Sequence, residues 1–196
     1  MRRLVILLVV VLSTALASTT GTAKAGLIGG CGLTAPVFAP WGDWSGYYFA
    51  PNGGFENGST GWSLSGGAAV VSQNNEPWYI AGFGSRALQI PTGGKAAINV
   101  CYGLTYPAVR FFVAGQGGTA KVHVRVSSRS LLGLVSILDG ATFTADQGWQ
   151  PSPKISTLLS AVASLVGTSS LQLQFTVESG TAQIDDLFVD PLLVRS

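Results

Sequence analysis

Two stretches of the chain, 121–126 and 171–177, alternate strictly between apolar and polar residues. This is the period of a β-strand with one buried face. Valine, leucine and phenylalanine hold the apolar positions of both stretches. The polar positions are Lys121, His123, Arg125, Gln172, Gln174 and Thr176. We therefore expect two half-buried strands in antiparallel sheets whose outer face is polar.

Other short apolar runs are bounded by Gly, Pro or Tyr-Pro and predict further strands. These runs are 87–90, 96–101, 109–114, 131–138 and 183–189. Earlier in the chain, Trp62-Ser63-Leu64 and Ala69-Val70-Val71 are joined by Ser65-Gly66-Gly67, which predicts a hairpin. Many short strands at this spacing indicate an all-β fold, built as an antiparallel two-sheet sandwich.

The segment 152–167 differs, because its apolar residues recur at helical spacing. They are Ile155, Leu158, Leu159, Val162 and Val166. Ser152 as N-cap, Pro153 in the first turn and Gly167 after the last apolar residue are typical helix boundaries. The pattern predicts one short helix, although Ile155 to Leu159 fits an edge strand equally well.

The N-terminus has the three-part layout of a secretory signal peptide. Met1-Arg2-Arg3 precedes the apolar run 4–12, which is too short to span a bilayer, and small or polar residues follow in 13–25. Ala23 and Ala25 suit a cut before Gly26, and Ala15/Ala17 offers a second site. A lipoprotein site at Cys31 is the alternative, but it lies far from the apolar run. We expect a secreted or extracellular protein, with association with the cell envelope as an alternative. No membrane span is expected after cleavage of the signal peptide.

After the signal peptide at 1–25 we distinguish two regions. Residues 26–51 are rich in Gly and aromatic residues, and Pro36, Pro40 and Pro51 interrupt regular structure, which indicates an irregular N-terminal arm. Residues 52–196 form the sandwich domain. About 170 residues suit a single domain with a real core, and we expect a monomer.

Removal of the signal peptide changes the charge balance. Arg2, Arg3 and Lys24 are three of the eleven basic residues, so eight remain against nine acidic residues, a formal net charge of −1. Nucleic-acid affinity comes mainly from clustered Lys and Arg. The charge balance therefore argues against a polyanion-binding protein. We do not expect nucleic acid to be a partner.

Cys31 and Cys101 are the only cysteines. An even number in an exported chain predicts a disulfide bond, which an oxidising compartment preserves. Closing a loop of about 70 residues removes roughly 4 kcal/mol of unfolded-state entropy in the chain-entropy description. The alternative, two free thiols with a chemical role, lacks a CxxC pair or a metal-ligand cluster.

Candidates for catalysis are few. His123 is the only histidine, and it lies between two valines of a predicted strand, where a solvent-facing position is the simplest interpretation. Glycoside hydrolysis requires two carboxylates across a cleft, whereas Asp185 and Asp186 are neighbours on a strand and should point to opposite faces. The glycines at 115, 117 and 118 lack the Lys-Ser/Thr ending of a phosphate-binding loop. We do not expect an enzyme.

Two segments resemble the opening and closing signatures of galactose-binding-like jelly-roll domains, especially the carbohydrate-binding modules of secreted glycosidases. They are Pro51 to Trp62 (PNGGFENGSTGW) and Gln183 to Pro191 (QIDDLFVDP). The chain is also similar to a group of secreted bacterial proteins of unassigned function, through Cys31-Gly32 and Ala39-Pro40-Trp41. The resemblance implies a jelly-roll sandwich in which Phe55-Glu56 lies beside Ile184 to Asp186.

In such modules this junction often holds a structural calcium ion. The resemblance therefore implies Glu56 and Asp185 as ligands, with Asp186 as a substitute. Calcium binds six to eight oxygens, which carboxylates and the carbonyls of a Gly-rich turn supply. In the alternative interpretation these acids cap turns or pair with Arg86 or Arg110.

Sugar binding in these modules uses aromatic rings that stack on pyranoses, flanked by amide and charged side chains. The candidates here are of two kinds: rings expected at the rim and polar residues on the outer sheet face. They are Trp78, Tyr79 and Tyr102, and Arg125, Gln172 and Gln174. The predicted outer face has no evident aromatic platform, and Trp62 and Trp149 are expected to pack in the core.

Three functions remain as hypotheses. The first is a secreted, non-catalytic binding module for a polysaccharide. The second is a structural or protein-interaction domain of the cell envelope, in which the arm around Trp41, Trp44, Tyr47 and Tyr48 docks a partner while the sandwich folds without it. The third, an enzyme acting on glycans, would need a cleft with two facing carboxylates.

Overall fold

The computed structural model describes residues 32–75, 78, 80–82, 84–101, 108–130, 135–157 and 168–190. Nearly every element in these ranges is a strand, which confirms the all-β prediction. The strands are β1 (Tyr48–Phe49), β2 (Trp62–Ser65), β3 (Ala69–Val71), β4 (Ala87–Pro91), β5 (Lys95–Val100), β6 (Ala108–Gly115), β7 (Ala120–Ser130), β8 (Val135–Ala145), β9 (Gln150–Pro151), β10 (Ile155–Ser156), β11 (Thr168–Ser179) and β12 (Thr181–Asp190). A single turn of 3-10 helix, η1 (Ala39–Trp41), precedes them.

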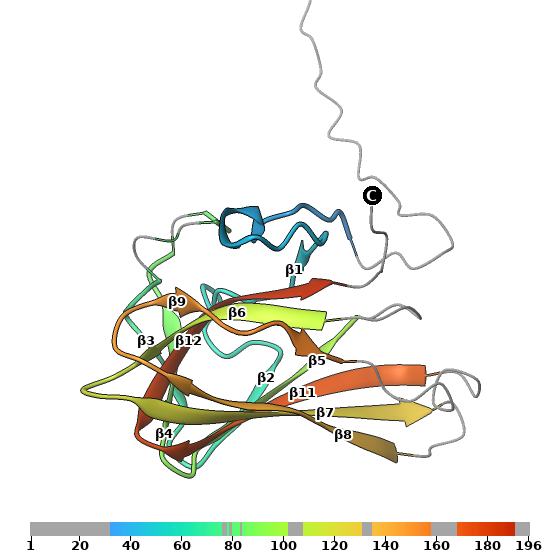
Figure 1. Cartoon of the computed structure of the whole chain (residues 1–196). Helices are drawn as coiled ribbons and strands as arrows, with labels where there is room; N and C mark the ends of the chain where they lie inside the picture. Colours follow the sequence, from blue (N-terminus) through green and yellow to red (C-terminus); the bar gives the residue numbers. More distant parts are fainter. Residues whose placement is uncertain are drawn as a thin grey trace, which may run out of the picture.

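The strands form two antiparallel sheets packed as the predicted jelly-roll sandwich (Figure 1). One sheet has the order β2-β5-β11-β7-β8. The other has the order β10-β6-β12-β4-β3, with β1 paired to β12 and β9 paired to β6. Strand β1, which belongs to the predicted arm, pairs with the last strand, β12.

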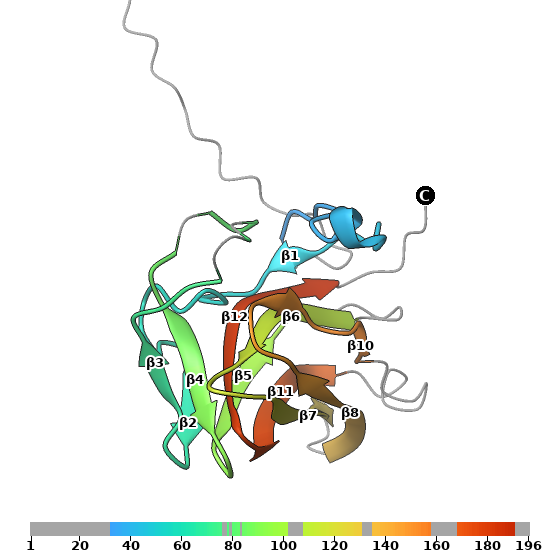
Figure 2. The ribbon, with the colours of Figure 1, turned by 60° about the vertical axis from the view of Figure 1, so that its left-hand side comes forward.

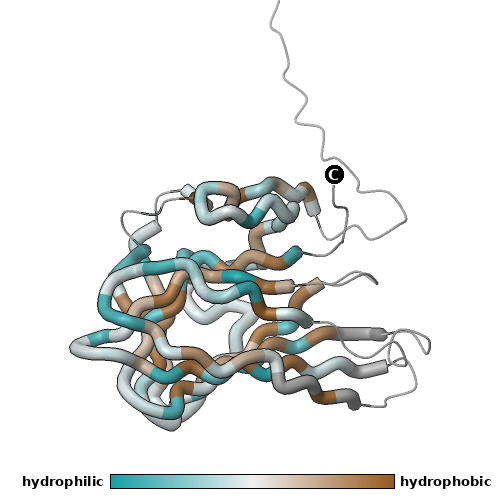
Figure 3. The backbone as a smooth tube through the Cα atoms, viewed as in Figure 1, coloured by the Kyte–Doolittle hydropathy of each residue, from teal (hydrophilic) through white to brown (hydrophobic). Residues whose placement is uncertain are grey.

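The main core lies between the two sheets and contains the apolar positions of the two alternating stretches. Val122, Val124 and Val126 of β7 are fully buried, as are the corresponding residues of β11. The hydropathy colours alternate along these strands accordingly (Figure 3). Burying one such side chain contributes about 1.5 to 3 kcal/mol. Trp62 packs in the same core, as predicted, and its indole Nε1 donates to the carbonyl of Asn52 at 3.1 Å.

The N-terminal arm forms a third layer on the outer face of the larger sheet (Figure 2). Phe38 and Tyr47 of the arm pack with Phe112 of β6 and Phe188 of β12 in a second, aromatic cluster. Both faces of β6 and β12 are thus covered, which explains why every residue of β6 is buried. Tyr48 adds a hydrogen bond from its hydroxyl to the carbonyl of Cys101, at 2.9 Å.

Two predicted elements are wrong in detail. Trp62–Ser65 and Ala69–Val71 are strands, but they do not form a hairpin, because β2 pairs with β5 and β3 pairs with β4 of the other sheet. Gly66 and Gly67 have φ angles of 63° and 83°. Two successive left-handed residues turn the chain out of one sheet and into the other.

The predicted helix does not begin at Ser152. Ile155–Ser156 forms β10 on the edge of β6, which confirms the edge-strand alternative for these two residues. The buried hydroxyl of Ser152 accepts a hydrogen bond from the backbone N–H of Phe111 at 3.1 Å. Pairing with an open sheet edge therefore outweighs the helical spacing at this point. The rest of that prediction, 158–167, lies outside the described residues.

Other predictions fall partly or wholly outside the described ranges. These are the signal peptide at 1–25, the first residues of the arm and the first half of the predicted strand 131–138. The second half of that strand belongs to β8, which continues to Ala145. Within the described part of the chain, no helix is long and apolar enough to cross a membrane.

Candidate functional site

The outer face of the five-stranded sheet presents the polar positions of the alternating strands. Arg125 of β7 lies directly opposite Gln174 of β11, and Gln172 lies two residues further along β11. Their apolar neighbours point into the core, so these three polar side chains point outward. The structure thus brings together the three polar residues that the sequence predicted for ligand binding.

Strand β5 extends this face on the far side of β11. Lys95 and Asn99 are exposed on it, with the small residue Ala97 between them and opposite Gln174. Thr176 lies between Lys95 of β5 and His123 of β7. Side chains that can donate or accept hydrogen bonds therefore span three neighbouring strands.

The aromatic candidates do not join this face. Trp78 lies over the arm and the larger sheet, with its ring centroid 5.1 Å from that of Trp41 and 6.5 Å from that of Phe112. Its indole Nε1 donates to the carbonyl of Trp149 at 3.0 Å. Trp78 therefore lies on the side of the larger sheet and not beside the polar residues, and its role in ligand binding stays a prediction. Tyr79 and Tyr102 lie outside the described residues.

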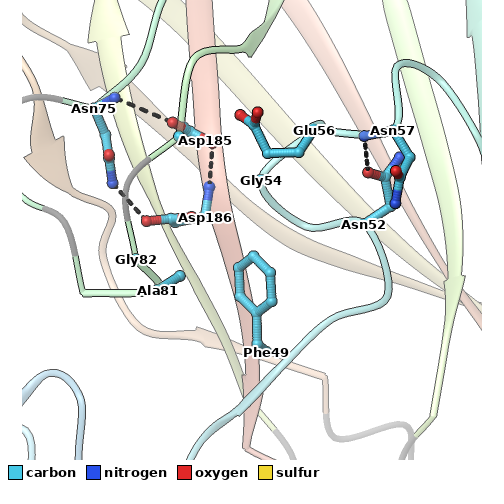
Figure 4. Close-up of a pocket in the computed structure, with 11 residues that line it drawn as sticks. Phe49, Asn52, Gly54, Glu56, Asn57, Asn75, Ala81, Gly82, Asp185 and Asp186 are labelled. Atoms are coloured by element: carbon cyan, nitrogen blue, oxygen red, sulfur yellow. Dashed lines mark hydrogen bonds between the residues drawn. The ribbon is translucent and has the colours of Figure 1, made fainter.

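A second candidate site is a pocket beside β12 that opens to solvent. It is lined by Phe49, Asn52, Glu56, Asn75, Asp185 and Asp186, among others (Figure 4). The expectation that Asp185 and Asp186 point to opposite faces is wrong. A β-bulge interrupts the pairing of β12 with β6 between Asp185 and Phe188, and Asp186 has a φ of 48°. This left-handed residue breaks the alternation, so both carboxylates reach one pocket.

Asn75 binds both carboxylates of the pocket. Its backbone N–H donates to Oδ2 of Asp185 at 3.1 Å, and its side-chain amide donates to Oδ2 of Asp186 at 2.7 Å. Glu56 caps a turn, because its carboxylate accepts hydrogen bonds from the backbone N–H groups of Ser85, at 2.7 Å, and Arg86, at 3.0 Å. Sequence reasoning missed Asn75, which lies 110 positions from Asp185 in a loop without a recognisable motif.

Burial sets the electrostatics of this pocket. Burial and the negative charge of Asp186 together raise the pKa of Asp185 to about 8. Hydrogen bonds from the backbone N–H groups of Asp186 and Asn75 lower this pKa, but by less. Burial likewise raises the pKa of Asp186 to about 6, even though Asn75 donates to its carboxylate. The pocket is therefore acidic and short of positive charge.

The acidic residues of the pocket are the candidate ligands for a metal ion. Among the described residues, no group of three or more His, Cys, Asp or Glu side chains is arranged to hold a metal ion. Glu56 nevertheless lies close enough for its charge to raise the pKa of both Asp185 and Asp186. Arg110, one of the predicted alternative partners, pairs instead with Asp43 at 3.2 Å.

The remaining predicted residues have structural contacts. His123 lies 3.5 Å from Glu178 and 3.2 Å from the hydroxyl of Thr142, at one end of the polar face. Cys101 is disulfide-bonded, and the described residues include no free cysteine. Its predicted partner, Cys31, lies outside the described residues, so the pairing stays a prediction.

Known proteins resemble this chain in structure but not in sequence. No protein-family model and no curated protein sequence matches it. One similar structure is the CBM22-1 xylan-binding domain of Xyn10C from Paenibacillus barcinonensis, at 19% identity and a TM-score of 0.51 over 72% of this chain and 93% of that domain.

Two other similar structures belong to larger proteins. The CBM22-1 and GH10 modules of Clostridium thermocellum endo-1,4-β-D-xylanase 10B, complexed with xylohexaose, match at 20% identity and a TM-score of 0.54 over 73% of this chain and 28% of theirs. The enzymatically active domain of bacteriophage CBA120 tailspike protein 4 matches at 12% identity and a TM-score of 0.54. This match covers 72% of this chain and 21% of the tailspike chain. These structures therefore share the fold of this chain, a two-sheet jelly-roll sandwich.

Proposed function

We propose that this chain is an exported, non-catalytic carbohydrate-binding module whose ligand lies on the outer face of the five-stranded sheet. The observation that carries the proposal is the cross-strand pair of Arg125 and Gln174, with Gln172 beside it on the same open face. Its fold supports it, because one similar structure is a xylan-binding domain. The partner is a polysaccharide of the cell envelope or its surroundings.

The chemistry of this face suits sugar hydroxyls. A glutamine amide donates two hydrogen bonds and accepts two, and a guanidinium donates five in a planar fork. Because the three side chains extend from paired strands, the sheet fixes their spacing before a ligand arrives, which lowers the entropy lost on binding.

Retention on polysaccharides tests the proposal. The mature chain should migrate more slowly in gels that contain its polysaccharide, and the double variant Gln172→Ala/Gln174→Ala should lose this retardation. Gln116→Ala, which removes an amide outside the polar face, is the matched control and should keep it. A panel of neutral and acidic plant and bacterial polysaccharides that retards neither wild type nor control would refute the proposal.

Binding without catalysis is part of this proposal. Asp185 and Asp186 are 1% and 5% exposed, and both accept hydrogen bonds from Asn75. A glycosidase needs two carboxylates that flank the scissile bond of a bound sugar. Such buried and engaged carboxylates suit a structural role better than an acid and a nucleophile.

We further propose that the acidic pocket binds a structural calcium ion through Asp185 and Asp186, with Glu56 near enough to add negative charge. Calcium favours carboxylate oxygens, and an oxygen that accepts one hydrogen bond keeps a lone pair for a metal. A bound cation would lower the pKa values that burial has raised. It would thereby stabilise the junction of β12 with the loop that follows β1.

The alternative function is a structural or protein-interaction domain of the envelope that recognises no sugar. One observation favours it: Trp44 of the arm is 77% exposed. The other aromatic residues predicted for docking are less available, since Tyr47 and Tyr48 are buried and Trp41 is half-buried. Trp44→Ala should abolish partner capture from envelope extracts if this function holds, and should leave polysaccharide retention unchanged if the first one does.

A further inference from the structure

Charges are distributed unevenly over the sandwich. Lys95, Lys121 and Arg125 all lie on the outer face of the five-stranded sheet, and His123 lies among them. The acids Asp43, Glu56, Asp185, Asp186 and Asp190 lie at the arm or in the pocket beside β12. The net charge of −1 expected for the mature chain argued against a polyanionic ligand, but it is a sum over the whole molecule. It hides the basic residues that lie together on this one sheet face.

Two of these cations are available to a ligand. Glu178 pairs with Lys121 at 2.8 Å and with His123 at 3.5 Å. Among the side chains that the structure describes, no acid pairs with Lys95 or Arg125. Strand register places the backbone of Asp139 of β8 opposite Arg125.

This face has no described aromatic ring on which a neutral sugar could stack. The positions around Arg125 and Gln174 hold small side chains instead, namely Ala97, Ser63 and Ser127. Aromatic rings supply most of the contact area in apolar ligand sites. Hydrogen bonds and charge are therefore the interactions that the described residues of this face offer a ligand.

The spacing of the two available cations fits an extended chain. Arg125 and Lys95 lie on β7 and β5, with β11 between them, and they are offset by two residues along the strands. Strand geometry puts their Cα atoms roughly 12 Å apart. Gln174 and Thr176 lie between them on β11, so a chain that crosses β11 diagonally meets a cation, two hydrogen-bonding side chains and a second cation.

We propose that the ligand of this face is a polysaccharide with repeating carboxylates, a polymer that contains uronic acid units. The inference rests on the proposed function and names its ligand class. Each such unit offers a carboxylate, which matches the guanidinium fork of Arg125 and the ammonium of Lys95, and hydroxyls, which match Gln174 and Thr176. An unsubstituted neutral chain would leave both cations without a partner.

Calorimetric titration with polygalacturonic acid and with its fully methyl-esterified form tests the inference. The ester removes the negative charges and keeps the sugar backbone. The acid form should bind about tenfold more tightly at low salt, and the difference should shrink as salt screens the charges. Arg125→Gln and Lys95→Gln should each weaken binding of the acid form about fivefold. Arg86→Gln, which removes an exposed charge beside the other sheet, should leave it unchanged.

The possible outcomes separate the two proposals. Equal affinity for the acid and the ester would overturn the uronic acid inference while supporting a carbohydrate-binding function. Failure to bind either form or any neutral polysaccharide would overturn both. Single-stranded DNA carries negative charge without pyranose hydroxyls, and equally tight binding of DNA would also overturn the inference. Unchanged melting temperatures of the variants would show that the substitutions act on binding.

Discussion

The guanidinium of Arg110 lies 4.5 Å above the ring centroid of Phe38. Arg110 belongs to β6, and Phe38 belongs to the arm, where it is fully buried against Tyr47, Phe112 and Phe188. The arm is thus part of the folded domain and not an appendage to it. Removing it would expose an aromatic cluster on the outer face of the larger sheet.

Phe38→Ala should therefore destabilise the whole sandwich. Removal of a buried phenylalanine ring typically costs about 3 to 5 kcal/mol, through lost burial and the cavity that remains. Urea unfolding followed by tryptophan fluorescence measures this loss. Trp44→Ala, at an exposed position of the same arm, should change stability by less than about 0.5 kcal/mol. Equal stability of Phe38→Ala and wild type would show that the arm does not support the sandwich.

Asp43 should make the stability of the arm dependent on acid pH. Burial raises its pKa, but hydrogen bonds from Tyr47 and Ser45 and the charge of Lys154 outweigh burial and lower the pKa to about 2. A carboxyl whose pKa is lowered by folding stabilises the fold above its unfolded pKa of about 4, and this stabilisation disappears as the pH falls towards 2. At neutral pH, the free energy of unfolding of Asp43→Asn should be about 1 to 2 kcal/mol lower than that of the wild type.

The difference in unfolding free energy between wild type and Asp43→Asn should narrow as the pH is lowered from 4 to about 2. In this range the wild-type carboxyl becomes protonated and is then neutral, like the asparagine. Denaturant titrations at a series of pH values measure it. Asp146→Asn, at an exposed position, serves as the control for loss of one negative charge. A constant difference across this range would contradict the assigned role of the Asp43 charge.

Asp185 and Asp186 should give the opposite dependence on pH. Their pKa values are raised by burial to about 8 and about 6, so each group favours the fold while protonated and opposes it once ionised. In the presence of chelator, the melting temperature should therefore fall as the pH rises from 5 to about 8.5.

Added calcium should reverse this fall, because the cation binds the ionised carboxylates and not the protonated ones. Differential scanning calorimetry with chelator, calcium or magnesium at each pH measures the effect. Asp185→Asn should remove most of the pH dependence and most of the response to calcium. A melting temperature that depends on neither pH nor calcium would count against both the acidic pocket and the proposed ion.

The sequence predicted β7 and β11 well because alternation is a local property, and each stretch has one face that must be buried. Local patterns could not decide which strands pair. Ser65-Gly66-Gly67 is as suitable for crossing between sheets as for a hairpin, and only the pairing of β2 with β5 and of β3 with β4 distinguishes the two. The edge of β6 likewise determines the conformation of Ile155–Ser156.

The candidate sites show the same limit. The outward positions of Arg125, Gln172 and Gln174 follow from alternation, but the contribution of Lys95 depends on the register of β5 with β11. The opposite-face expectation for the two aspartates failed because it assumed a regular strand. Asp186 instead has a positive φ, which its sequence neighbours do not specify.

The separation of Trp78 from the polar face leads to a final prediction. Trp78 contacts Trp41 and Phe112, so its ring contributes to the packing of the arm on the larger sheet. Gln174 lies in register between Ala97 of β5 and Arg125 of β7, and its side chain points away from the core. Trp78→Ala should therefore lower the melting temperature and leave polysaccharide affinity unchanged. Gln174→Ala should lower polysaccharide affinity and leave the melting temperature unchanged. Affinity electrophoresis and thermal unfolding of the two variants distinguish the sites, and loss of retention in Trp78→Ala alone would move the ligand to the arm side of the sandwich.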